Sequence, residues 1–155
     1  MCCNNWVSVS RAVTTPFDEV QYQCQDRDDV ARDLDRGVER LAETRAAIGP
    51  DIELLVDCHC RFDLPMALRV AEKVRPLDLF WFEEPVPCDQ VAALVEICRQ
   101  SGQTIAGGES LFGREAFWDY VAQGAVHVIM HSVKHAGGLT ECKRIAALSE
   151  IRQIP

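Results

Sequence analysis

Long apolar runs and an excess of basic residues are both missing from this 155-residue sequence. No stretch approaches the roughly 18 apolar residues of a membrane span, and residues 1–6 lack the basic start and apolar core of a signal peptide. Against 24 Asp and Glu there are 16 Lys and Arg, which gives a net charge of −8. Nucleic acids and anionic membrane surfaces are bound through basic patches, so we expect neither as a partner. The sequence therefore predicts a cytoplasmic protein.

Paired-cysteine and phosphate-binding motifs are missing as well. The chain has 8 cysteines but no CxxC pair. In a reducing compartment most of them are expected to be free thiols that pack as small apolar groups. No GxGxxG motif follows the first strand, which leaves little support for a dinucleotide-binding protein. Nothing resembles a phosphate-binding loop, which disfavours an open sheet with an acidic phosphotransfer site.

The chain alternates between segments of helical periodicity and short apolar runs. In the first clear helix, Val30, Leu34, Val38 and Leu41 recur at three- and four-residue steps and share one face. Residues 6–13 alternate only weakly, as a strand might. The expected helices lie at about 29–48, 63–75, 89–99 and 114–122, with a fifth after Gly138, and the expected strands lie at 52–56, 79–83, 104–109 and 126–130.

Strands that alternate with helices, without a hairpin signal between them, are typical of an α/β fold with a parallel sheet. Two layouts fit this pattern: an open doubly wound sheet and part of a (β/α)8 barrel. A complete barrel takes about 250 residues. This chain of 155 residues is therefore expected to supply little more than half of one.

Three of the apolar runs end in a carboxylate, at Asp57, Glu83 and Glu109, which are 26 residues apart in both intervals. Such spacing fits one strand, one helix and two loops. The three acids are therefore expected at the carboxyl ends of successive parallel strands, the edge where barrel enzymes build their sites. Converging carboxylates repel one another unless a cation lies between them, and Mg2+ prefers oxygen ligands of this kind.

Around these acids the chain resembles the enolase superfamily, and within it the mandelate racemase / muconate lactonizing enzyme group. The resemblance runs from about Asp28 to Glu150, and its motifs are Val56–Asp63, Trp81–Pro85, Ala106–Glu109 and His135–Glu141. It implies a partial TIM-type (β/α) barrel of about five βα units with parallel strands. It also implies that Asp57, Glu83 and Glu109 bind Mg2+, which stabilises an enediolate after a base removes the proton α to a substrate carboxylate.

His59 stands two residues after Asp57, and an Asp-x-His motif at this strand resembles that of acid-sugar dehydratases. The resemblance implies that His59 is a catalytic acid that helps to expel hydroxide from a small-molecule sugar acid. The alternative is a solvated histidine at the rim. Both side chains would point the same way if the strand continued past Asp57. The expected activity is thus a Mg2+-dependent hydro-lyase, and the full-length family implies a homo-oligomer.

The sequence departs from the family at the residues that transfer protons. The family's second strand usually ends in a Lys, but the matching stretch Arg11–Asp18 has none, and the first Lys is Lys73. Ser132 stands where racemases and dehydratases have an Asp, and Lys134 falls two residues late for a lactonizing-type Lys.

We expect residues 1–27 to be a remnant of the second barrel strand and residues 28–155 to be a partial barrel, without the capping domain and last strands. Alternatives are a non-catalytic remnant, or a racemase or cycloisomerase.

Several neighbouring residues have simpler interpretations. Glu84 alternates to the other face from Glu83 and is expected to be structural, with a cation as one candidate partner. A zinc or copper site at residues 58–60 is disfavoured, because adjacent strand residues cannot all face one metal. His131 lies at a strand end and is a candidate substitute acid or base. Other residues are expected to serve in packing or at the surface: Phe80, Trp81, Phe82, His127 and His135.

Overall fold

The structure, a computed structural model, describes residues 11–14 and 27–155, with side chains from residue 32 onward. Within these residues the strands form one parallel sheet in which they are ordered as they occur along the chain. The strands are β1 (Arg11–Thr14), β2 (Glu53–Asp57), β3 (Leu79–Glu83), β4 (Ile105–Gly107) and β5 (Val128–Ile129). Sequential order is that of a barrel wall, whereas a doubly wound sheet reverses order at a switch point. The partial barrel prediction is therefore confirmed.

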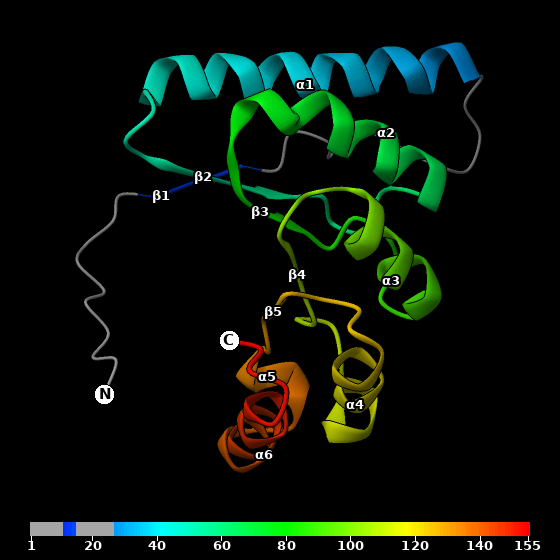
Figure 1. The fold of residues 1–155 in the computed structure, drawn as a ribbon, viewed down its shortest axis with the longest axis vertical. Helices are drawn as coiled ribbons and strands as arrows, with labels where there is room; N and C mark the ends of the chain where they lie inside the picture. Colours follow the sequence, from blue (N-terminus) through cyan, green and yellow to red (C-terminus); the bar gives the residue numbers. More distant parts are fainter. Residues whose placement is uncertain (1–10, 15–26) are drawn as a thin grey trace.

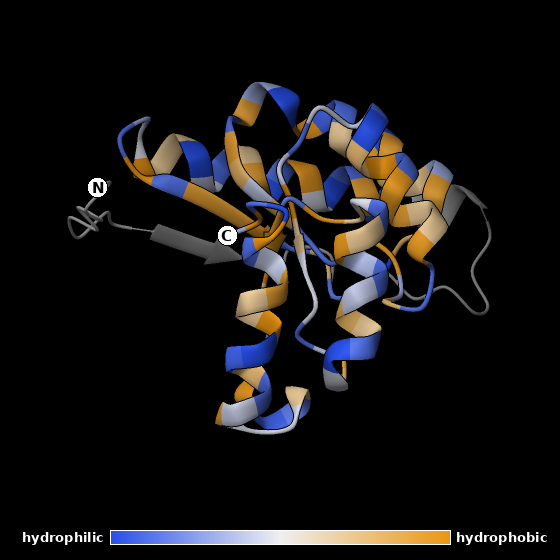
Figure 2. Ribbon diagram, turned by 60° about the horizontal axis from the view of Figure 1, so that its bottom comes forward, coloured by the Kyte–Doolittle hydropathy of each residue, from blue (hydrophilic) through white to orange (hydrophobic). Residues whose placement is uncertain are grey.

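The helices lie along the outside of the curved sheet, from the top of Figure 1 over the right side to the bottom. They are α1 (Arg27–Ile48), α2 (Leu64–Val74), α3 (Val91–Gln100), α4 (Gly113–Gln123), α5 (Val133–Ala136) and α6 (Leu139–Glu150), with a short 3-10 helix η1 (Arg75–Leu77). In Figure 2 the strands are largely hydrophobic, whereas hydrophobic and hydrophilic residues alternate along the helices, as they do in amphipathic elements. Strands inside and helices outside place any site at the loops of one barrel end.

The start of α2 shows why these segments become helices. The Asp63 carboxylate accepts the backbone N–H of Met66 at 2.9 Å and so caps the amino end of the helix. Pro65 lies in the first turn, where its missing N–H costs nothing. The buried stripe contains Ala67, Val70, Ala71 and Val74. A hydrogen-bonded cap at one end and a continuous apolar stripe along one side together fix this helix.

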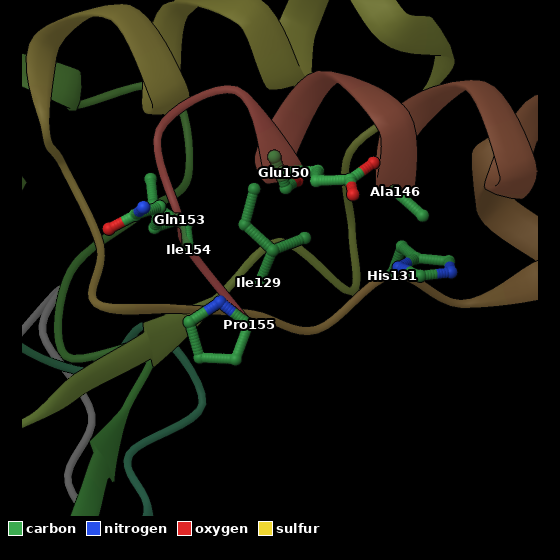
Figure 3. Close-up of a pocket in the computed structure, with 8 residues that line it drawn as sticks. Ile129, His131, Ala146, Glu150, Gln153, Ile154 and Pro155 are labelled. Carbon is green, nitrogen blue, oxygen red and sulfur yellow. The ribbon is translucent and has the colours of Figure 1, made fainter. Parts of the chain in front are cut away.

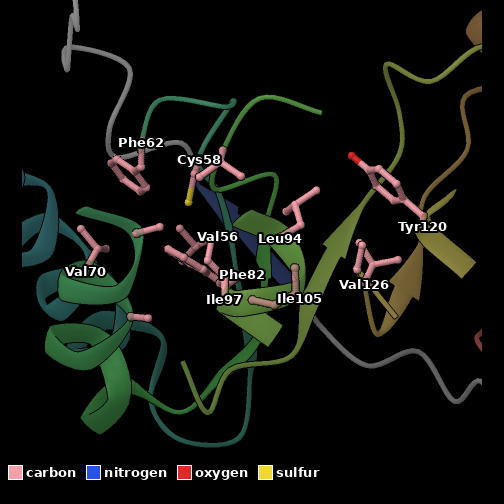
Figure 4. Close-up of a cluster of buried hydrophobic side chains, with 14 of the residues drawn as sticks. Val56, Cys58, Phe62, Val70, Phe82, Leu94, Ile97, Ile105, Tyr120 and Val126 are labelled. Carbon is pink, nitrogen blue, oxygen red and sulfur yellow. The ribbon is translucent and has the colours of Figure 1, made fainter. Parts of the chain in front are cut away.

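The hydrophobic core lies between the sheet and these helices. Val56 pairs in register with Phe82, and Phe82 pairs with Ile105, so the three side chains share the helix-facing side of the sheet. All three are fully buried, and Phe82 stacks on Phe62 with ring centroids 6.3 Å apart. Figure 4 shows this row against α2 and α3. Because strand side chains alternate, the next residues along, Asp57 and Glu83, point to the inner face.

Arg45 joins α1 to the amino ends of the strands. Its guanidinium donates to the backbone carbonyls of Gly49, Ile52, Leu77 and Asp78 at 2.6–2.9 Å. One planar group with five N–H donors thus bridges segments that are more than thirty residues apart in sequence. This end of the sheet is held by a hydrogen-bond network rather than by apolar packing alone.

We therefore expect Arg45→Met to lower the free energy of unfolding by about 2 kcal/mol, because charge-assisted hydrogen bonds are lost while the apolar stem is kept. Urea unfolding measures the change. Arg99→Met, at an exposed position of α3, is the matched control and is expected to change stability by less than about 0.5 kcal/mol. Equal effects of the two substitutions would contradict the bridging role.

The structure differs locally from the sequence predictions. The third helix begins at Val91 rather than at residue 89, because a turn closed by Gln90 N–H to the Pro87 carbonyl comes first. Strand β5 is shorter than the predicted 126–130. Helix α5 was not predicted, because four residues are too few to show periodicity. Of the predicted strand 6–13, residues 6–10 lie outside the described residues.

Candidate functional site

Asp57 and Glu83 end β2 and β3 and face each other in register. They share the inner face of the sheet, opposite the core row of Val56 and Phe82. Glu109 follows two residues after the end of β4. The three sequence-predicted acids are therefore brought to one end of the sheet, at the carboxyl ends of three adjacent strands.

A tight turn folds His59 back onto Asp57. The strand ends at Asp57, and His59 and Cys60 both have left-handed backbone angles, with φ of 49° and 57°. Asp57 Oδ1 accepts the His59 backbone N–H at 2.9 Å, and its Oδ2 lies 2.8 Å from His59 Nε2. The two side chains were expected to point the same way if the strand continued past Asp57. Strand geometry does not continue; the turn makes the contact.

Glu83 is a nearly buried carboxylate, with 5% of the residue exposed. Burial is the largest cause that raises the pKa of Glu83, the negative charges of Asp57 and Glu109 also raise it, and the resulting pKa is about 7. The indole Nε1–H of Trp81 donates to Glu83 Oε2 at 3.1 Å, which acts in the opposite direction. Trp81 was expected in the core, but its two-residue spacing from Glu83 places it on the inner face. The two-residue spacing between Trp81 and Glu83 was the feature of the sequence from which this placement could have been predicted.

The turn that carries Glu109 requires glycine. Gly108 has φ of 116°, and a Cβ there would lie 2.9 Å from the Phe117 ring. On the other side of the turn, His135 Nδ1 of α5 lies 3.0 Å from the Glu109 carbonyl oxygen. His135 was expected to be a surface or packing residue, and nothing local in the sequence indicates this contact. The backbone of Glu109 is thus held from two sides.

Across residues 11–14 and 27–155, no group of three or more His, Cys, Asp or Glu side chains is already arranged to hold a metal ion. The chemistry of the acids nevertheless fits a hard dication, because all their donors are oxygen atoms. The raised pKa of Glu83 reflects the cost of clustering these negative charges, and a cation among them would relieve it. Carboxylate oxygens also have lone pairs to spare beyond the contacts with His59 and Trp81.

His131 faces the helical side of the sheet rather than the acids. Its ring packs edge-on against Phe117, with centroids 6.5 Å apart. It lines a pocket of about 450 Å³ between β5 and α6, with Ile129, Glu150 and Pro155 (Figure 3). This placement supports a packing role and not that of a substitute acid or base.

Two other predicted residues have local structural roles. His127 Nδ1 accepts the Ile105 backbone N–H at 3.0 Å, beside β4. Ser132 stands at the N-cap of α5, and its carbonyl accepts the Ala136 backbone N–H at 2.7 Å. The stretch that matches the family's second strand contains β1 (Arg11–Thr14), whose side chains lie outside the described part of the chain.

A parallel sheet in sequential order, flanked by helices and ending in acidic residues, defines part of a (β/α) barrel protein with its site at the carboxyl ends of the strands. The sequence matches the family described as "Enolase C-terminal domain-like" over residues 8–155. The chain belongs to this family.

Known proteins agree with this assignment. A D-galactonate dehydratase of Ralstonia nicotianae is 38% identical over 125 residues, which are 79% of this chain and 32% of that protein. A mandelate racemase/muconate lactonizing enzyme-like protein of Rubrobacter xylanophilus is 40% identical with a TM-score of 0.77, covering 80% of this chain and 32% of that one. A racemase of Streptomyces coelicolor, solved with bound magnesium, is 34% identical with a TM-score of 0.77, covering 78% and 34%.

The chain spans about a third of the length of the curated relatives that it matches. Among the described helices none is both long enough and apolar enough to cross a membrane.

Proposed function

We propose that this chain provides the metal-binding part of an acid-sugar dehydratase, a hydro-lyase that depends on Mg2+. The observation that carries the proposal is the row of acids on the inner face, Asp57 in register with Glu83, with His59 Nε2 2.8 Å from Asp57. The similarity to D-galactonate dehydratases supports the same class of reaction and a small-molecule sugar acid as substrate.

Asp57, Glu83 and Glu109 would hold the Mg2+ through their carboxylate oxygens. When bound, the ion would supply positive charge that offsets the negative charge developing on a substrate carboxylate as the neighbouring proton is removed. Burial of Glu83 and its contact with Trp81 exclude water from one side of the site and orient that carboxylate.

His59 would be the acid that gives a proton to the departing hydroxyl group. Its side chain is 44% exposed, whereas that of Asp57 is 14% exposed, so the imidazole stands on the open side of the acids. The Asp57 carboxylate holds Nε2 at 2.8 Å and fixes the ring orientation. A protonated imidazole in this place has a proton to donate within reach of the rim.

A second candidate function is Mg2+ binding without turnover. It is favoured by Ser132, which follows β5 at the N-cap of α5, and by the absence of Lys before Lys73 in the sequence. This candidate predicts metal binding by the same three acids but no product from any sugar acid. A screen of sugar acids with the metal-loaded chain separates the two candidates, because only the first yields a 2-keto-3-deoxy product.

Asp57→Asn is expected to weaken Mg2+ binding by at least about 100-fold, because an amide is a poor substitute for a charged ligand on a hard dication. Titration calorimetry of the unsubstituted chain and the variant measures the effect. Asp63→Asn is the control: Asp63 caps α2, and Asn caps a helix about as well as Asp. Unchanged Mg2+ affinity in Asp57→Asn would reject the proposed metal site.

A further inference from the structure

Glu84 lies directly after Glu83 but on the opposite side of the sheet. Its backbone is left-handed, with φ of 39°, and only 5% of the residue is exposed. The proposed metal site does not use this carboxylate. A charged side chain in so buried a place needs specific partners, and those partners identify its role.

The partners of Glu84 belong to the loops on both sides of its own. Its backbone carbonyl accepts the Cys60 N–H at 2.7 Å, and its own N–H donates to the Ala106 carbonyl at 3.0 Å. In the side chain, Oε1 accepts the Gly108 N–H at 3.1 Å, and Oε2 accepts the Cys60 thiol at 3.2 Å. One residue thus bridges the loop after β2 and the loop after β4.

Both bridged positions adjoin proposed site residues. Gly108 immediately precedes Glu109, and Cys60 immediately follows His59. The length of the Glu84 side chain therefore sets the distance between the turn that carries Asp57 and His59 and the turn that carries Glu109.

We propose that Glu84 is a positioning residue that holds the loops of Asp57 and Glu109 at the separation required for Mg2+. This inference rests on the proposed function. The role follows from the geometry of Glu84 and its hydrogen-bond acceptors, not from its charge. Glu84→Gln keeps the length and a carbonyl oxygen for the Gly108 N–H, and its amide NH2 can donate to the Cys60 sulfur where Oε2 now accepts from the thiol. It should therefore preserve the spacing. Glu84→Asp keeps the charge but is one methylene shorter, so it should not.

The test compares Mg2+ and Ca2+ affinities in the unsubstituted chain, Glu84→Gln and Glu84→Asp. Mg2+ demands near-ideal octahedral geometry, whereas Ca2+ tolerates irregular sites. A variant that merely unfolds more easily lowers the affinities for both ions by the same factor. The ratio of the Mg2+ affinity to the Ca2+ affinity therefore reports the geometry of the site alone. For Glu84→Asp we expect the Mg2+ affinity to fall by about tenfold, the usual effect of losing such an outer partner. The Ca2+ affinity should change much less, so the ratio of Mg2+ affinity to Ca2+ affinity should fall. For Glu84→Gln we expect it to stay close to that of the unsubstituted chain.

Hydrogen exchange of the Gly108 amide provides a second readout that needs no metal. Exchange should be faster in Glu84→Asp and unchanged in Glu84→Gln, because only the shorter side chain gives up the hydrogen bond. An unchanged ion ratio in Glu84→Asp, or equal damage in Glu84→Gln, would overturn the positioning role. Absence of Mg2+ binding in the unsubstituted chain would instead reject the proposed function, and the Gly108 exchange rates would still decide whether Glu84 holds this loop.

Discussion

Glu83→Gln is expected to make the metal-free chain more stable near neutral pH while removing its response to Mg2+. Burial and the charges of Asp57 and Glu109 raise the pKa of Glu83 from 4.5 to about 7. Between these values the folded chain binds a proton that the unfolded chain releases, so stability falls as the pH rises through this window. The loss of stability caused by ionising the buried Glu83 is absent below about pH 4.5 and complete above about pH 7.

A neutral Gln at this position carries no such penalty. At about pH 8 the variant should be more stable than the metal-free wild type by on the order of 2 kcal/mol, and at about pH 4 the difference should vanish. Saturating Mg2+ should raise the stability of the wild type by about 3 kcal/mol when present at 100 times its dissociation constant. The variant should not respond. Thermal unfolding at both pH values, with and without Mg2+, measures all of these differences.

Glu115→Gln, at an exposed position of α4, removes the same charge away from the site and serves as the control. It should leave the pH dependence and the Mg2+ response unchanged. A Glu83→Gln chain that is less stable than wild type without metal at pH 8 would show that the acids are not electrostatically strained. A variant that still responds to Mg2+ would show that Glu83 is not a ligand.

Gly108→Ala is expected to cause the largest loss of stability, about 3 kcal/mol or more, because strain and overlap act together. The backbone has φ of 116°, which L side chains rarely adopt, and the new Cβ would lie 2.9 Å from the Phe117 ring. Urea unfolding measures the loss. Because Glu109 is the next residue, the same change should also weaken Mg2+ binding.

Two further variants separate the strain from the overlap. Gly124→Ala has φ of 68° and nothing within 4 Å of the new Cβ, so it should cost only the backbone preference, about 1–2 kcal/mol. Phe117→Leu combined with Gly108→Ala should be less destabilising than the sum of the single changes, since a smaller side chain makes room. Strictly additive losses would mean that contact with Phe117 is not the cause.

The positions of the acids could be predicted from the sequence because they depend only on strand ends. Asp57 and Glu83 follow apolar runs of a length typical of strands, and parallel strands bring their carboxyl ends together. The contact between His59 and Asp57 could not be derived in the same way. It depends on a left-handed backbone at two non-glycine residues, His59 and Cys60. No local sequence pattern predicts such a backbone at these residues.

Contacts between separate loops could not be predicted from the sequence either. Glu84 was expected to be structural, with a cation as one candidate partner, but its described side-chain partners are the Gly108 amide and the Cys60 thiol. These lie 24 residues away in opposite directions along the chain. His135 reaches Glu109 across 26 residues. Periodicity describes what one segment does, whereas these pairs depend on how adjacent loops meet.

The sequential strand order has a consequence for synthesis on the ribosome. Each strand from β2 to β5 pairs with the strand made immediately before it. A newly emerged βα unit therefore finds its partner already exposed and need not wait for a distant segment. Loop closure between neighbouring strands spans only one helix, which keeps its entropic cost low. The sheet can thus grow co-translationally from one edge, with each finished unit serving as the template for the next.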